Sequence, residues 1–429
     1  MKILAIGAGA VLVFGGAAYA QYSLNQMVDH ELAGLSDSQR LSQQIGAPVT
    51  VDVRSQNHGL LNSSGSLSIR GDFPDGGSVQ SVIDYQVDHS ILSGVRYEFV
   101  LPEFVVHSDE RISLNEVMFQ GEPIRITGDL DAEGSQGQIL IPAVRGEDQD
   151  GTVVSIDAFP IHVTAHGFDE NALMGDYAMD AMIPQIQIQQ LNGQVVIENV
   201  RWAQHYLGND DVTQADMTLS VGHVESQGGG MATRFELNNA TLNVDTDISE
   251  QASSNMELTL VSATSMMGAV SDLSLKTHTG GFDGSTLKAW LLKIDQLEQS
   301  ADPEAVVADL EAYFTRHIDA LLAPSPYFQI EQMQFDMNGQ RFVEASGKIT
   351  LQTDKLPNGY FASLLNQQAA LDEEVLLSAV DISLDTSFGA QAAMMIGPMH
   401  PMLMGVLQSG QPLSFKMQNG QMILNGQPL

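Results

Sequence analysis

Two histidines in the sequence have the spacing of a zinc-binding pair. His162 and His166 are four residues apart, and on a helix this spacing would place two imidazoles on one face. The intervening Val163-Thr164-Ala165 predicts a strand instead. Four residues of strand span about 13 Å, which is too far for two ligands of one zinc ion. We therefore predict no zinc site at this pair.

Two acidic segments resemble calcium-binding loops. Asp129 to Gly134 matches the first half of an EF-hand loop, with carboxylates at positions one, three and five and glycine at position six. Position twelve is Leu140, where such a loop requires a bidentate glutamate. The second segment runs from Gly146 to Gly151. We interpret both as polar turns between strands, and weak Ca²⁺ binding is the alternative for the second.

A methionine cluster lies near the C-terminus. Thioether and imidazole ligands suit Cu(I), which makes copper handling one hypothesis. Methionine also fills irregular core space, and the chain contains 20 of them, so we favour a core role. A Met-rich groove for a partner or a lipid is the third interpretation. The residues are Met394, Met395, Met399, His400, Met402 and Met404.

The motifs of common enzymes are missing from the sequence. We find no His-Glu-x-x-His, no Gly-x-Ser-x-Gly, no phosphate loop and no dinucleotide fingerprint. The chain has no cysteine, which excludes disulfides, thiolate metal sites and thiol catalysis. We therefore predict no catalytic, cofactor-binding or metal-binding residues and no enzyme activity. A hydrolase whose site is assembled from distant segments is an alternative.

The charge of the chain limits its partners. It has 18 Lys and Arg against 53 Asp and Glu, a formal net charge of −35. Proteins bind nucleic acids largely by neutralising phosphates with Lys and Arg, so nucleic acid is excluded. Anionic lipid headgroups are repelled for the same reason.

The first twenty residues predict attachment to, or export across, a bacterial inner membrane. Residues 3–20 carry no charge and follow Lys2, which orients the segment with its N-terminus inside. The run is short for a spanning helix. It also ends in Ala18-Tyr19-Ala20, which resembles a signal-peptide cleavage site. A retained anchor and a cleaved signal both remain open, and both place the rest of the chain in the periplasm.

Hydrophobic periodicity divides the remaining chain into three parts. Residues 21–46 have apolar positions at helical spacing and predict a stalk helix. Residues 47–280 alternate apolar and polar positions, which is typical of antiparallel strands with one buried face. Residues 281–429 mix helices and strands. We predict a mainly β (α+β) protein with a large twisted antiparallel sheet.

Turn and capping signals place individual elements. Asn-Gly pairs at Asn192, Asn338 and Asn419 predict type I′ hairpins, because both central residues of that turn have positive φ. Asp302-Pro303 marks the start of a helix. The remaining expected elements are helices at 287–297, 302–322 and 360–365, a strand at 379–384, a proline-interrupted helix at 390–407 and a terminal hairpin at 413–424.

Three stretches resemble the YdgA-like family of inner-membrane-associated bacterial proteins. Asn419 to Gln427 is similar to the closing hairpin of that family. His58 to Ser64 resembles a family turn, with His58 and Leu61 in place of the usual Arg and Phe. Val87-Asp88-His89 resembles an Asp-His bend but lacks the Gly and Pro that follow it there. The resemblance favours a retained anchor and supplies no catalytic residues.

These features together predict a binding or scaffold protein of the cell envelope. The protein is tethered to the inner membrane through residues 3–20, with its body in the periplasm. A long β region with few lysines along its edges offers either an edge strand or an apolar trough. The partner is then an envelope protein or a lipid. Copper handling and the hydrolase described above are the alternatives.

Overall fold

The fold was analysed in a computed structural model of the chain. It describes residues 49–429 except 60, 73–77, 91–93, 108–110, 131–133, 148–150, 167–174, 209–212, 229–233, 267, 299–302, 367–370 and 397–410. The expected membrane segment and stalk helix therefore lie outside the described residues. None of the helices in the described ranges is long and apolar enough to cross a membrane. The chain forms two compact units, residues 1–167 with 177–181 and residues 168–176 with 182–429.

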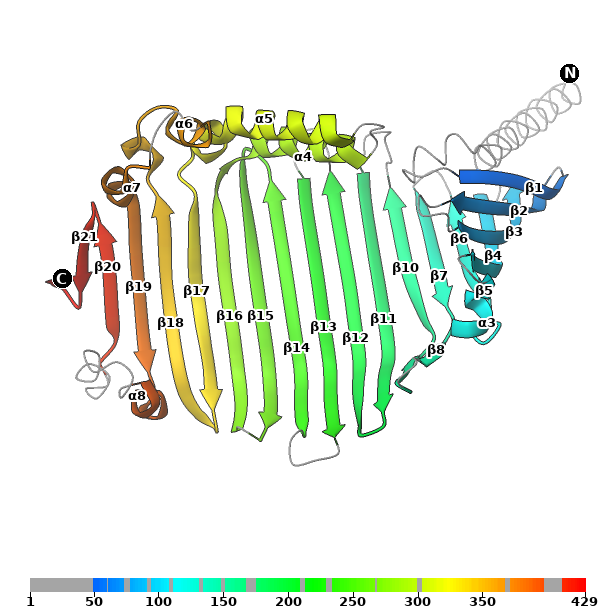
Figure 1. The fold of residues 1–429 in the computed structure, drawn as a ribbon, viewed down its shortest axis with the longest axis horizontal. Helices are drawn as coiled ribbons and strands as arrows, with labels where there is room; N and C mark the ends of the chain where they lie inside the picture. The colour runs from blue at the N-terminus through cyan, green and yellow to red at the C-terminus, as the bar shows by residue number, and fades with distance from the viewer. Residues whose placement is uncertain are drawn as a thin grey trace, which may run out of the picture. The chain divides into compact units, whose positions relative to one another are not determined.

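Unit 1 is an antiparallel sheet with one short helix (Figure 1). The first four strands pair in chain order, β4 also pairs with β5 and β6, β6 pairs with β7, and β7 pairs with β10. The elements are β1 (Val49–His58), β2 (Asn62–Asp72), β3 (Ser78–Ser90), β4 (Gly94–His107), β5 (Arg111–Ser113), α3 (Leu114–Met118), β6 (Ile124–Leu130), β7 (Ser135–Ile141), β8 (Val144–Glu147), β9 (Val153–Ile156) and β10 (Phe159–His166).

The core of unit 1 forms on one face of strands β2 to β4. Leu67, Tyr85, Val87 and Val95 are buried together, and Val51, Tyr97 and Phe99 pack against them. The burial of these residues confirms the inward-facing positions that the alternation of apolar and polar residues predicted. Val53, by contrast, is 47% exposed, so β1 is covered over only part of its length.

Unit 2 is a long antiparallel meander in which each strand from β12 to β22 pairs with the next (Figure 1). β11 (Gly175–Gln190) precedes it and is divided between the units, with residues 177–181 in unit 1. The strands are β12 (Gly193–Gly208), β13 (Thr213–Gly228), β14 (Phe235–Ile248), β15 (Gln251–Ser265), β16 (Gly268–Asp283), β17 (Tyr327–Met337), β18 (Gln340–Leu351), β19 (Val380–Phe388), β20 (Leu413–Gln418), β21 (Gln421–Leu424) and β22 (Gln427–Pro428).

The expected helices at 287–297, 302–322 and 360–365 are confirmed by α4, α5 and α6, whereas α7 and η1 were not expected, and of the expected helix at 390–407 only residues 390–396 are described. Pro303 is the first residue of α5, as the fixed φ of proline favours. The strands continue on both sides of the helical pair in one meander, because β16 pairs directly with β17. The helices are α4 (Gly284–Glu298), α5 (Pro303–Leu322), η1 (Thr353–Lys355), α6 (Tyr360–Leu365), α7 (Glu373–Ala379) and α8 (Ala390–Ile396).

Two of the three expected type I′ turns are confirmed. Asn338 and Gly339 have φ of 51° and 76°, and Asn419 and Gly420 have φ of 49° and 74°. The expectation is wrong at Asn192, which does not have positive φ. Gly193 is already the first residue of β12 and pairs with Gly228, so the turn is shifted by one residue and formed by Leu191 and Asn192.

Candidate functional site

The strand register of unit 2 collects its apolar residues on one face of the sheet. Leu242 of β14 lies opposite Leu219 on one side and Leu258 on the other. Leu258 in turn lies opposite Leu275, and Leu275 opposite Met333. Directly paired residues point to the same face of a sheet, so this row lies on one face. We call it the apolar face of unit 2.

The apolar face continues in both directions from this row. Its further members, placed by the same pairings, are Trp202, Met217, Val221, Val244, Met256, Leu260, Leu273, Phe328, Ile330, Ile349, Ile382, Leu384, Leu413, Phe415 and Met417. Such a face normally packs against a second layer, because burial of apolar surface is the main force that holds a sheet to its neighbour.

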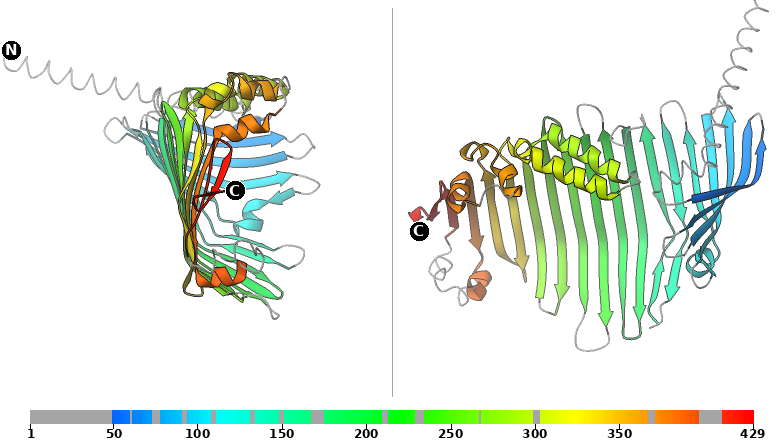
Figure 2. Two further views of the ribbon diagram at one scale, coloured as in Figure 1. Left: turned by 90° about the vertical axis from the view of Figure 1, so that its left-hand side faces the viewer. Right: turned by 45° about the horizontal axis from the view of Figure 1, so that its top comes forward.

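The second layer is present only at the ends of the strands. The fully buried side chains in the strands of unit 2 all lie on the apolar face. Examples are Ile248, Ala252, Val343 and Ala345. Helix α4 contacts β14, β15 and β16 near the first two, and α8 contacts β18 and β19 near the last two. Figure 2 shows α4 to α7 at one end of the strands and α8 at the other, all on the same side of the curved sheet.

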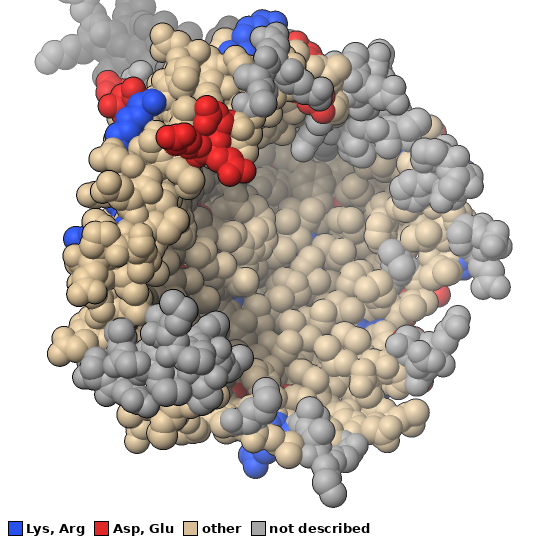
Figure 3. Space-filling model, turned by 60° about the vertical axis from the view of Figure 1, so that its left-hand side comes forward, with Lys and Arg blue, Asp and Glu red and all other residues tan. Residues whose placement is uncertain are grey.

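Between these helices the apolar face is open. Leu242, Leu258 and Leu275 are only half-buried, although they occupy central strands. Leu219 is 41% exposed and Ile349 is 47% exposed. Figure 3 looks obliquely onto this side of the sheet, where most of the visible side chains are other than Lys, Arg, Asp and Glu. A large exposed apolar surface on a soluble domain marks an interaction site.

The last described edge of the sheet is less suited to a partner. Pro428 lies in β22, which pairs with β21. Proline has no N–H to donate, so it cannot extend the hydrogen-bonded ladder to a further strand. Of the two surfaces expected from the sequence, the face is therefore the stronger candidate.

The opposite face of unit 2 is polar, and a row of hydrogen bonds crosses it. His205 Nε2 lies 2.8 Å from Asp176 Oδ1, and its Nδ1 lies 3.6 Å from Asp216 Oδ2. Further along the row, His278 Nε2 lies 2.7 Å from the Tyr327 hydroxyl. These contacts pair polar groups on the solvent-exposed polar face and involve no side chain of the apolar face.

Two carboxyls of this row are directly opposed. Asp216 pairs in register with Asp245 across β13 and β14. The side-chain hydrogen bond with Asp216, followed by desolvation, raises the pKa of Asp245. Like charges directly opposite each other destabilise a sheet, and sharing a proton relieves this repulsion.

The residues with metal-site spacing remain apart. His162 is exposed in β10, and His166 ends the same strand, as the sequence predicted. Asp129 lies in β6 and pairs with Arg96 at 3.1 Å. Leu140 lies in β7 opposite Arg125, so a strand follows Gly134 rather than a calcium-loop helix. In the described part of the chain, no three His, Asp or Glu side chains are placed to hold a metal ion.

The methionine cluster is only partly described. Met394 and Met395 lie on α8 and are 72% and 53% exposed, so these two do not have the core role that we favoured. The rest of the cluster, from Met399 to Met404, lies outside the described residues. The sequence analysis predicted an apolar trough as one of two surfaces. Each strand shows its alternation separately, however, so the pattern does not tell which residues form one face.

The fold is that of a mainly β protein built on a large antiparallel sheet with few helices. The chain belongs to a bacterial protein family of unknown function, DUF945, which matches residues 1–429. The match does not address the narrower YdgA-like resemblance. Comparison with curated proteins and with solved structures finds no match.

Proposed function

We propose that this protein is a non-enzymatic binding protein of the bacterial envelope whose apolar face holds acyl chains of a neutral or zwitterionic lipid. The observation that carries the proposal is the open apolar face between α4 and α8. The backbone groups of the inner strands are already paired within the sheet, so a ligand on the face gains mainly from apolar contact. Acyl chains offer this contact without polar groups to satisfy.

Charge favours the same class of ligand. The net charge of −35 disfavours an anionic headgroup, which leaves neutral and zwitterionic lipids. The uncharged segment at residues 3–20 and the YdgA-like resemblance support a retained inner-membrane anchor with the body in the periplasm. An anchor of this kind keeps the apolar face near its lipid source.

Photocrosslinking in living cells tests this function on the full chain. Bacteria are fed a fatty acid that carries a photoreactive group, and crosslinked peptides are mapped by mass spectrometry. We expect crosslinks in β13 to β18 at apolar-face residues such as Leu219, Leu258 and Ile349. Crosslinks at residues 3–20 report only the membrane and serve as an internal control. Crosslinks confined to that segment, or spread equally over both faces of the sheet, would overturn the proposal.

A further inference from the structure

A polar cavity of about 710 Å³ lies in unit 1, on the face of β2 and β3 opposite the core. Register places Ser66 and Asp84 side by side on this face, with Ser55 of β1 next to Ser66. The cavity is lined by Arg54, Ser66, Val82, Asp84, Pro102, Glu103, Arg111, Ser113, Asn115, Glu116 and Gly121. Nothing in the acyl-binding proposal uses this cavity.

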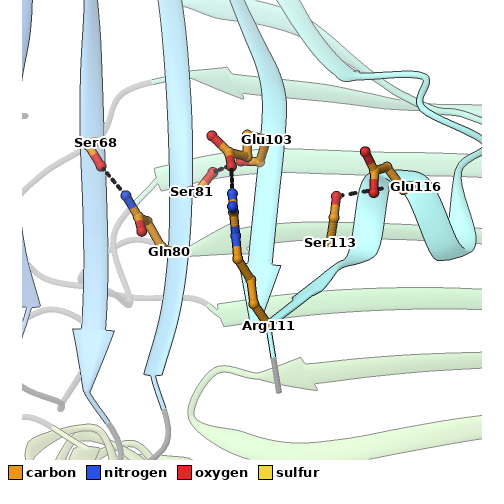
Figure 4. A network of polar contacts seen from close by, with 7 residues as sticks. All are labelled: Ser68, Gln80, Ser81, Glu103, Arg111, Ser113 and Glu116. Atoms are coloured by element: carbon orange, nitrogen blue, oxygen red, sulfur yellow. Dashed lines mark hydrogen bonds and ion pairs between the residues drawn. The ribbon is translucent and has the colours of Figure 1, made fainter. Parts of the chain in front are cut away.

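One side of the cavity is already neutralised. The Arg111 guanidinium donates to the Glu103 carboxylate, and the Ser81 hydroxyl donates to the Glu103 carbonyl at 3.3 Å (Figure 4). In the same view the Gln80 amide donates to the Ser68 hydroxyl at 3.0 Å. Of these residues, Glu103 and Arg111 line the cavity, and their charges are satisfied by each other.

The remaining charged groups have no partner within the described ranges. Arg54, Asp84 and Glu116 form no hydrogen bond or ion pair through their side chains. Apart from the paired Arg111 and Glu103, the lining therefore contains one guanidinium, that of Arg54, and two carboxylates, those of Asp84 and Glu116. A cavity of this composition matches a ligand that carries a cation and an anion.

A buried asparagine anchors the helix that carries Glu116. Asn115 is 3% exposed, and its Nδ2 donates to the carbonyls of Leu101 at 3.2 Å and Glu122 at 3.3 Å. These two bonds fix which amide atom is nitrogen. Its Oδ1 has no hydrogen-bond partner among the described residues. The bond to Leu101 fastens α3, and with it Glu116, to β4 at the wall of the cavity.

We propose that this cavity binds a small zwitterion, a free amino acid or a short peptide. The ammonium lies between Asp84 and Glu116. The carboxylate pairs with Arg54. An ammonium suits the two carboxylates because it carries three donors and no acceptor of its own.

Isothermal titration of the full-length protein in detergent with triglycine tests this inference. N-acetyltriglycine lacks the ammonium, and triglycine amide lacks the carboxylate. We expect saturable binding of triglycine, binding of N-acetyltriglycine weakened at least tenfold, and binding of the amide weakened several-fold. Absence of saturable triglycine binding, or equal binding of the acetylated peptide, overturns the proposal.

Surface variants locate the site without disturbing the buried asparagine. Asp84→Asn and Glu116→Gln should each weaken triglycine binding several-fold, and Arg54→Gln should remove the preference for triglycine over its amide. Glu98→Gln is the matched control, because its exposed pair with Arg125 lies outside the cavity. A loss of affinity in Glu98→Gln equal to that in Asp84→Asn would assign the effect to net charge and overturn the site.

Discussion

The sharpest prediction concerns Leu219, which lies opposite Trp202 on the apolar face. The chain has only two tryptophans, and the other, Trp290, has a buried Nε1 without a partner in the described structure. Trp290→Phe therefore removes no hydrogen bond and leaves Trp202 as a single fluorescent reporter. A monoacylglycerol with a brominated acyl chain quenches this reporter only by contact.

The size of the effect follows from the exposure of Leu219. Full burial of a leucine side chain stabilises by about 1.5–3 kcal/mol. Because 41% of Leu219 is exposed, a covering ligand gains about two fifths of this, or roughly 0.6–1.2 kcal/mol. Leu219→Gln loses this gain and also buries an amide, so a total of about 1–2 kcal/mol, or roughly 5–30-fold in affinity, is expected.

The assay is quenching of Trp202 in the full-length Trp290→Phe protein, reconstituted in lipid nanodiscs. Ser220→Gln is the control, because Ser220 is the next residue of the same strand and points to the polar face. We expect Ser220→Gln to bind the brominated lipid as the parent does. Equal quenching curves for Leu219→Gln and the parent, or an equal loss in Ser220→Gln, would refute the reasoning.

Three further predictions concern the turns, the opposed carboxyls and the membrane. Gly420→Val should destabilise the terminal hairpin by about 1–3 kcal/mol because φ at Gly420 is 74°, whereas the control Gly146→Ala should not, because Gly146 does not have positive φ. Hydrogen exchange of β20 and β21 measures the difference. Unchanged exchange in Gly420→Val contradicts the turn assignment. Because the folded-state pKa of Asp245 is raised, the stabilising contribution of the protonated carboxyl is present at acid pH and is lost as pH rises. Asp245→Asn should therefore raise the melting temperature at pH 7 more than at pH 4. A change in melting temperature that is equal at both pH values speaks against the shared proton. The uncharged segment at residues 3–20 predicts that alkaline carbonate leaves the full-length protein in the membrane pellet, whereas a soluble form that begins at Gln21 would show a cleaved signal.

Local physical rules account for the elements that the sequence located correctly. Pro303 sets the start of α5, and Asn419-Gly420 sets the turn of the last hairpin, because backbone preferences act within a few residues. The misplaced turn at Asn192 shows the limit of these rules. There β11 ends at Gln190 and β12 begins at Gly193, so the turn falls on Leu191 and Asn192 rather than on the Asn-Gly pair.

The alternation of apolar and polar residues, the strongly acidic composition and the absence of common enzyme motifs can all be read directly from the amino-acid sequence. The three-dimensional fold, by contrast, is needed to show that four leucines from different strands form one row on one face, namely Leu219, Leu242, Leu258 and Leu275. It also decided that helices cover only the ends of that face, and that the buried Asn115 carbonyl lies unpaired beside a polar cavity. These features depend on strand register and on contacts between remote segments, which a pattern with a period of two residues does not encode.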